Sequence, residues 1–156
     1  MSDYQVTDQA KLFFEESLAL NQVFKALPEG TEIQVRLDER VNGVLSYDGD
    51  ATRFNLGEAK KPDFTVDLSS EALRRLGDQP PSELTALSRE LFRETLSGQV
   101  SWKAHLSVTD LKEKGYVQSL KDLGPTLQGE VFQVLMIWLG TANEKFEMIK
   151  SRFTKS

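Results

Sequence analysis

The apolar residues near the start of the chain recur every three or four positions between residues 7 and 27. This spacing places them on one face and predicts an amphipathic helix. Thr7 is the expected N-cap, and Pro28 with Gly30 would end the helix. The apolar positions that form this predicted face are Ala10, Phe13, Phe14, Leu20, Phe24 and Leu27.

From residue 31 the period changes to alternation, which is typical of half-buried strands. Strands are predicted at 33–37, 44–47, 52–56 and 63–68. Asn42-Gly43 and Asp48-Gly49 indicate hairpin turns on either side of the second strand, because both dipeptides tolerate a positive φ.

After residue 68 the helical period returns. A helix is predicted from Ser69 to Gly77, with a serine cap and an acidic first turn. Further elements are predicted as a helix opened by Pro80-Pro81-Ser82 and closed near Gly98, a strand over 100–106 and a helix over 110–123.

Residues 127–153 carry the strongest periodic pattern in the chain. It predicts a helix roughly 40 Å long at 1.5 Å per residue. Around residues 131–139 a second apolar set, which includes Met136, widens its face beyond the roughly 100° stripe of a surface helix. Three interpretations are open: the helix is ordinary core on the sheet, it lines or closes an apolar cavity, or it pairs with another subunit.

Strands grouped together and helices grouped together favour the α+β class over alternating α/β. The length of 156 residues fits one domain, which we assign to residues 1–156. Within it we expect a core at about 31–124, an N-terminal helix at 7–27 and a C-terminal helix at 127–153.

Composition removes several classes of function. A net charge of −5 disfavours binding to nucleic acid and to an anionic membrane surface. The absence of cysteine excludes disulfides, thiolate zinc sites and cysteine nucleophiles. Neither the Walker pattern that ends in Gly-Lys-Ser/Thr nor the G-x-G-x-x-G pattern of nucleotide-binding loops is present. The longest apolar run, Val134–Leu139, is much shorter than the ~20 residues of a membrane-spanning helix, and the N-terminus lacks the pattern of a secretory signal. We therefore expect a cytoplasmic protein with no stable membrane insertion.

The side chains that could perform chemistry have simpler structural interpretations. His105, the single histidine, shares a predicted strand face with Ser101 and Lys103, which indicates the solvated side. Asp63 and Asp67 lie four positions apart on one strand, so both are expected to face solvent rather than to converge across a cleft. Four basic side chains within 16 positions are expected on a solvated face, with contact to a lipid headgroup or an acidic partner as the alternative: Lys60, Lys61, Arg74 and Arg75. We predict no catalytic residue, no metal site and no cofactor.

The segment Lys60–Leu73 resembles the sterol carrier protein type 2 family. In that family a strand that reads Asp, apolar, Thr, apolar runs into a serine-capped helix, as Asp63–Val66 and Ser69 do here. Gly98–Trp102 and Tyr116–Leu123 are similar to its last strand and following helix, so the resemblance covers roughly residues 31–124. The sequence departs from the family at three places: Pro80-Pro81, Ser107-Val108 in place of a frequent glycine, and the helix after Pro125.

This resemblance implies a five-stranded, mostly antiparallel sheet with helices packed on one face. It also implies an apolar tunnel in which family members hold sterols, fatty acyl chains or other lipids, generally without chemistry. Some members are accessory domains of larger enzymes or of quinone biosynthesis complexes. We therefore expect a non-catalytic carrier of a lipid or other hydrophobic molecule, such as a fatty acyl chain, a sterol-like molecule or an isoprenoid. The candidate ligand-binding residues are Phe54, Leu56, Leu68, Leu91, Phe92, Val100, Trp102, Leu106, Met136 and Trp138.

Two other functions remain open. The same fold with a filled core would serve as an interaction or accessory module, either as a subunit of an enzyme complex or as a homodimer formed through helix 127–153. An enzyme that uses backbone groups and a bound cofactor is the third hypothesis, and we expect the chain not to be one.

Overall fold

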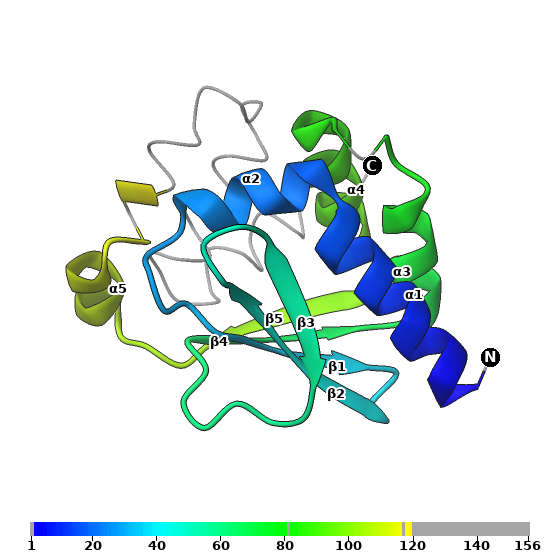
Figure 1. Cartoon of the computed structure of the whole chain (residues 1–156), viewed down its shortest axis with the longest axis horizontal. Coiled ribbons are helices and arrows are strands. Elements are labelled where there is room, and N and C mark those ends of the chain that lie inside the picture. The colour runs from blue at the N-terminus through cyan, green and yellow to red at the C-terminus, as the bar shows by residue number, and fades with distance from the viewer. Residues whose placement is uncertain (1, 81, 117, 120–156) are drawn as a thin grey trace.

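The structure is a computed structural model, and it describes residues 2–80, 82–116 and 118–119. In chain order its elements are α1 (Asp3–Glu16), α2 (Leu18–Ala26), β1 (Ile33–Leu37), β2 (Val41–Tyr47), β3 (Thr52–Leu56), β4 (Phe64–Leu68), α3 (Ser70–Gly77), α4 (Leu84–Leu96), β5 (Val100–Ala104) and α5 (Val108–Lys114). The strands form one sheet in the order β3-β2-β1-β4-β5, in which β1 and β4 are parallel and the other neighbours are antiparallel. Helices α1 to α4 lie on one face of this sheet (Figure 1). The predicted α+β class and mostly antiparallel sheet are confirmed.

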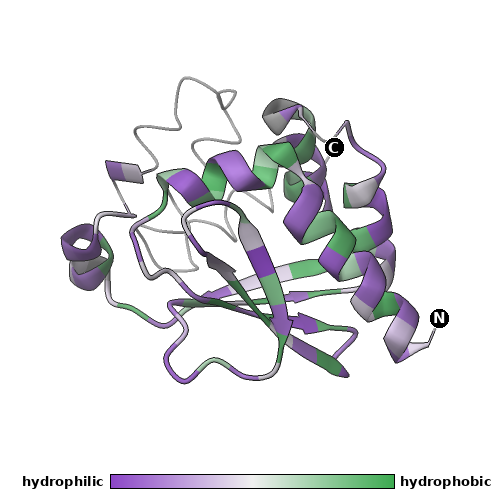
Figure 2. Cartoon of the chain, in the orientation of Figure 1, coloured by the Kyte–Doolittle hydropathy of each residue, from purple (hydrophilic) through white to green (hydrophobic). Residues whose placement is uncertain are grey.

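The core lies between the sheet and its helix layer. Strand alternation sends one set of side chains toward the helices, among them Val35, Phe54, Val66 and Val100, each at most 5% exposed. Helix α1 covers β3 and β2, and α4 packs on β5. Figure 2 shows apolar and polar positions alternating along the strands and around α1 and α2. Burial of such side chains contributes about 1.5–3 kcal/mol each.

The segment predicted as a single helix at 7–27 forms two helices, because Ser17 interrupts the helical conformation. The Ser17 N–H still donates to the Phe13 carbonyl, while its hydroxyl accepts from the Leu20 N–H. Ser17 therefore ends α1 and caps α2 in an extended conformation. The predicted cap at Thr7 is also wrong, since α1 begins with a capping box at Ser2.

The turn predicted at Asn42-Gly43 is wrong, and that dipeptide lies inside β2. The β1–β2 turn is formed instead by Asp38 and Glu39, which adopt positive φ angles of 52° and 60°. Gly43 has a packing role: a Cβ there would overlap the ring of Phe54 on the neighbouring strand. The second predicted turn, at Asp48-Gly49, is confirmed.

Other element boundaries also differ from the predictions. Helix α4 begins at Leu84 rather than at the prolines, β5 ends at Ala104 rather than at 106, and the strand predicted at 44–47 extends back to Val41. Helix α5 starts at Val108 and ends before Gly115, whose left-handed φ of 99° closes it, so the predicted helix 110–123 is not continuous. The predicted cap at Ser69 is confirmed, because its hydroxyl accepts from the Ala72 N–H. The helix predicted at 127–153 lies outside the described residues.

Candidate functional site

The outer edge of β3 is held by side chains from the helices. The β2–β3 register turns the Thr52 and Phe54 N–H groups away from β2. Asn21 Oδ1 accepts from the Thr52 N–H at 2.7 Å, and Glu15 Oε2 accepts from the Phe54 N–H at 3.0 Å. Asn21 also donates to the Ser17 carbonyl at 2.8 Å. The break between α1 and α2 is thereby attached to this edge strand, where the rings of Phe14 and Phe54 lie 5.5 Å apart.

Apolar side chains also pack on the core at the β5 end of the sheet. Helix α2 contacts α4, and α4 contacts β5. These elements contribute apolar side chains that pack on the core and are only partly buried. We call the members of this set at α4 and β5 the β5-side apolar surface: Leu91 of α4, Trp102 of β5 and Leu106 after it.

The ten candidate ligand-binding residues divide into four groups. Phe54, Leu68 and Val100 are buried in the core, at 2%, 5% and 1% exposure. Four are partly buried at the α4–β5 end: Leu91, Phe92, Trp102 and Leu106. Leu56 is 63% exposed at the end of β3, and Met136 and Trp138 lie outside the described residues.

The structure therefore brings some of the candidates together and separates others. Leu68 and Val100 are register partners on β4 and β5, beside Val66 and Trp102. Phe54 and Leu56 belong to β3, at the other edge of the sheet. The candidates that share one region are those of β4, α4 and β5, which adjoin the β5-side apolar surface.

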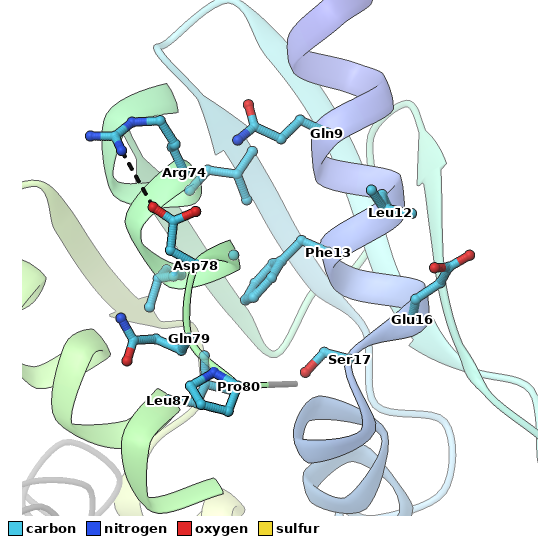
Figure 3. Close-up of a pocket in the computed structure, with 13 residues that line it drawn as sticks. Gln9, Leu12, Phe13, Glu16, Ser17, Arg74, Asp78, Gln79, Pro80 and Leu87 are labelled. Carbon is cyan, nitrogen blue, oxygen red and sulfur yellow. Dashed lines mark hydrogen bonds and ion pairs between the residues drawn. The ribbon is translucent and has the colours of Figure 1, made fainter. Parts of the chain in front are cut away.

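A groove of about 350 Å³ lies between α1 and the α3–α4 region (Figure 3). Its apolar lining includes Phe13, Leu73, Leu76 and Leu87, and its polar lining includes Gln9, Arg74 and Asp78. None of the ten candidates lines it. The periodicity of apolar residues does not separate a core position from the floor of a groove, so the sequence pattern could not locate it.

The prediction that Asp63 faces solvent is wrong, because Asp63 is buried. The Tyr116 hydroxyl donates to Asp63 Oδ2 and lies 3.0 Å from Thr31 Oγ1, while Lys114 Nζ lies 2.9 Å from Asp63 Oδ1. Burial, followed by the neighbouring Asp63 carboxylate, raises the pKa of Tyr116. The Tyr116 ring also meets that of Phe64 edge-on at 5.2 Å. These contacts attach the segment after β5 to the starts of β1 and β4.

Asp67 lies on the outer face, 3.4 Å from Arg36, at 39% side-chain exposure.

A partly buried ion pair joins α3 to α4, so Arg75 is not simply part of the solvated basic face that the sequence predicted. Arg75 Nε and Nη2 donate to the Glu94 carboxylate, each at 2.7 Å. Arg75 lowers the pKa of Glu94, whereas burial and a hydrogen bond to Glu94 raise the pKa of Glu90. Glu90 and Glu94 are only 5% and 3% exposed. This arrangement fixes the two helices that flank the groove.

The outer face of β5 agrees with its prediction. Ser101, Lys103 and His105 are exposed, and His105 Nε2 lies 2.6 Å from Thr65 Oγ1. Among the described residues, no group of three or more His, Asp or Glu side chains is placed to hold a metal ion. Within that same part of the chain, every helix is too short or too polar to cross a membrane.

Comparison with known proteins gives a structural similarity. No family model matches the chain, and no curated protein matches it. A solved structure of a protein named "UbiJ-SCP2 Ubiquinone synthesis protein" is similar, with 18% sequence identity and a TM-score of 0.44. The similarity covers 65% of this chain and 80% of that one. The name of that protein includes SCP2, the abbreviation of the family that the sequence resembles.

Proposed function

We propose that the chain reversibly binds an apolar molecule at the β5-side apolar surface, as a carrier or accessory protein without chemistry of its own. The observation that carries this proposal is the set of partly buried apolar side chains there, notably Leu91, Trp102 and Leu106. They pack directly on the buried core, so a ligand lying on them would extend that core. The sequence resemblance adds the ligand classes: fatty acyl chains, sterol-like molecules and isoprenoids.

Binding of this kind needs no catalytic group. Each methylene removed from water contributes about 0.8 kcal/mol. About a dozen methylenes would therefore supply several kcal/mol before the loss of freedom on binding is subtracted. Met136 and Trp138, which lie outside the described residues, remain sequence-based candidates for further contacts.

The test is displacement of a fluorescent fatty acid from the full chain, with a fatty acid, a sterol and a long isoprenoid as competitors. We expect saturable binding that weakens about tenfold in Trp102→Ala, a loss equivalent to about 1.4 kcal/mol. Tyr4→Ala is the matched control, because Tyr4 is an aromatic residue that is 76% exposed on α1. Absence of saturable binding below about 100 μM, or equal loss in both variants, would contradict the proposal.

A second pair of measurements locates the ligand. Gly77→Leu adds a side chain to the groove between α1 and α3, and we expect it to leave fatty-acid affinity unchanged. Native mass spectrometry of gently purified protein should also retain an apolar molecule in wild type and less of it in Trp102→Ala. If Gly77→Leu abolishes binding while Trp102→Ala does not, the ligand occupies the groove instead.

A further inference from the structure

Within the described residues, helix α5 is attached to the domain by few side chains. Leu111 is buried in the core, whereas Thr109, Asp110, Lys112 and Glu113 are exposed. In Figure 1, α5 stands apart from the layer that α1 to α4 form on the sheet. Segments with few buried apolar contacts are those that open most readily while the rest of a protein stays folded.

The other attachments of this segment converge on one buried carboxylate. Lys114 Nζ lies 2.9 Å from Asp63 Oδ1, and the Tyr116 hydroxyl donates to Asp63 Oδ2. The Tyr116 hydroxyl also lies 3.0 Å from Thr31 Oγ1, and the Tyr116 ring packs edge-on against Phe64. A buried charge is costly to leave unpaired, so these two donors hold the segment after β5 closed over Asp63.

Hydrogen bonds mark where this segment meets the sheet. The His105 N–H donates to the Asp63 carbonyl at 2.9 Å, which continues the pairing of β4 with β5 past Ala104. From Ser107, whose hydroxyl accepts from the Asp110 N–H, the backbone belongs to α5. Leu106 joins the paired strand to the capped helix, and it is therefore the point about which α5 can turn.

Leu106 is also one of the three side chains of the β5-side apolar surface. The same residue thus belongs to the proposed ligand site and to the connection with α5. A turn of α5 away from Asp63 would move Leu106 with it and uncover that end of the apolar surface.

We infer that residues 107–116 form a flap, latched by Asp63, that opens as one unit about Leu106 and controls how fast an apolar ligand exchanges at the β5-side apolar surface. The role in ligand exchange rests on the proposed function, whereas the flap itself does not. When Lys114 and Tyr116 leave Asp63, Leu111 is withdrawn from the core together with them, and the five strands stay paired.

Hydrogen exchange of the full chain, followed by mass spectrometry of its peptides, tests the flap. In wild type we expect the amides of residues 109–116 to exchange together and faster than those of β1 and β4. Lys114→Met removes one donor to the buried carboxylate and should speed exchange in the flap about tenfold, with β1 and β4 unchanged.

Other variants separate the latch from a general effect on α5. Lys112→Met is the matched control, because Lys112 is an exposed lysine in the same last turn and lies outside the Asp63 contacts; it should leave flap exchange unchanged. Lys114→Arg keeps a cation and should restore slow exchange. Tyr116→Phe keeps the ring against Phe64 but loses the hydroxyl, so it should speed flap exchange as Lys114→Met does.

Stopped-flow mixing with a fluorescent fatty acid tests the role in ligand exchange. We expect the association and dissociation rates to rise together in Lys114→Met while the Kd stays the same, because the flap controls access and does not contact the ligand. Lys112→Met should keep both rates of wild type.

Each measurement has a result that would overturn the inference. Flap exchange that is unchanged in Lys114→Met, or that rises equally in β1 and β4, would show that no latched unit opens. Unchanged fatty-acid rates in a variant whose flap opens faster would overturn the role in ligand exchange. If wild type shows no saturable fatty-acid binding, the proposed function fails and this role fails with it, while hydrogen exchange still decides whether the flap exists.

Discussion

The two edges of the sheet, β3 and β5, differ in how their residues are packed and hydrogen-bonded. At β3, helix side chains accept hydrogen bonds from the edge N–H groups, and Phe54 fills the space that Gly43 leaves open. Toward β5, Trp102 and its neighbours pack on the core yet stay partly exposed. Edge groups bonded by side chains protect a sheet from pairing with other strands. The side chains at the β3 edge thus complete the fold, and those toward β5 leave the partly exposed apolar surface on which the proposed binding depends.

The largest expected effect comes from Gly43→Ala on the β3 side. The new Cβ would overlap the Phe54 ring, and overpacking of this kind lowers the free energy of unfolding by about 3 kcal/mol. Urea unfolding of the two proteins measures the difference. Shortening the ring in a Gly43→Ala/Phe54→Leu double variant should recover part of it. Equal midpoints for wild type and Gly43→Ala would show that Phe54 repacks freely, and the contrast between the two sides would fail.

A smaller loss is expected from Glu15→Ala, which removes the acceptor for the Phe54 N–H. Leaving this group unsatisfied lowers the free energy of unfolding by about 1–2 kcal/mol. The freed edge should also favour association, measurable by sedimentation at rising protein concentration. Glu16→Ala is the control, since Glu16 is the exposed neighbour on the same helix. A monomeric Glu15→Ala protein of unchanged stability would contradict the role given to this carboxylate.

The smallest expected effect is on how the free energy of unfolding depends on pH, through Glu90 and Glu94 of α4. Burial raises the pKa of Glu90 in the folded state, so the folded chain holds that proton more tightly than the unfolded chain. Wild type should therefore lose stability relative to Glu90→Gln as the pH rises above 4.5, the ordinary glutamate value, through the raised pKa.

Glu94→Gln should show the opposite slope. The Glu94 pKa is lowered mainly by Arg75, so its contribution is present above pH 4.5 and is lost as the pH falls. Thermal unfolding between about pH 4 and 8 measures both slopes. Parallel curves for the three proteins would mean that this pair titrates alike in the folded and unfolded states.

Local patterns in the sequence were enough to predict most of the fold. The alternation over Ile33–Leu37, the cap at Ser69 and the turn at Asp48 each depend on neighbours within a few residues, and each is confirmed. The turn prediction at Gly43 was wrong because glycine is needed there to leave room for the Phe54 ring on the neighbouring strand, and not for a turn. Ser17 breaks a helix through one hydroxyl cap, which the apolar period does not reveal.

The sites were harder to predict for the same reason. The Asp63 carboxylate accepts hydrogen bonds from Lys114 and Tyr116, which lie more than 50 positions later in the sequence. No local pattern therefore shows that this carboxylate is buried. The groove arises where apolar faces of α1, α3 and α4 fail to meet completely, which depends on the helix packing. Apolar candidates such as Phe54 and Trp102 have the same sequence signature, yet one is buried core and the other is partly exposed.

The Asp63 contacts have a consequence for synthesis on the ribosome. Four strands of the sheet are encoded by residue 68, but the carboxylate at the start of β4 meets its partners only when Lys114 and Tyr116 have left the exit tunnel. At about 5–20 residues per second, the nascent chain carries an unpaired acid at the sheet for several seconds. Pauses in translation before residue 114 would therefore lengthen the life of an incomplete fold, and a stalled chain ending there should be cleaved by protease more readily than one extended past Tyr116.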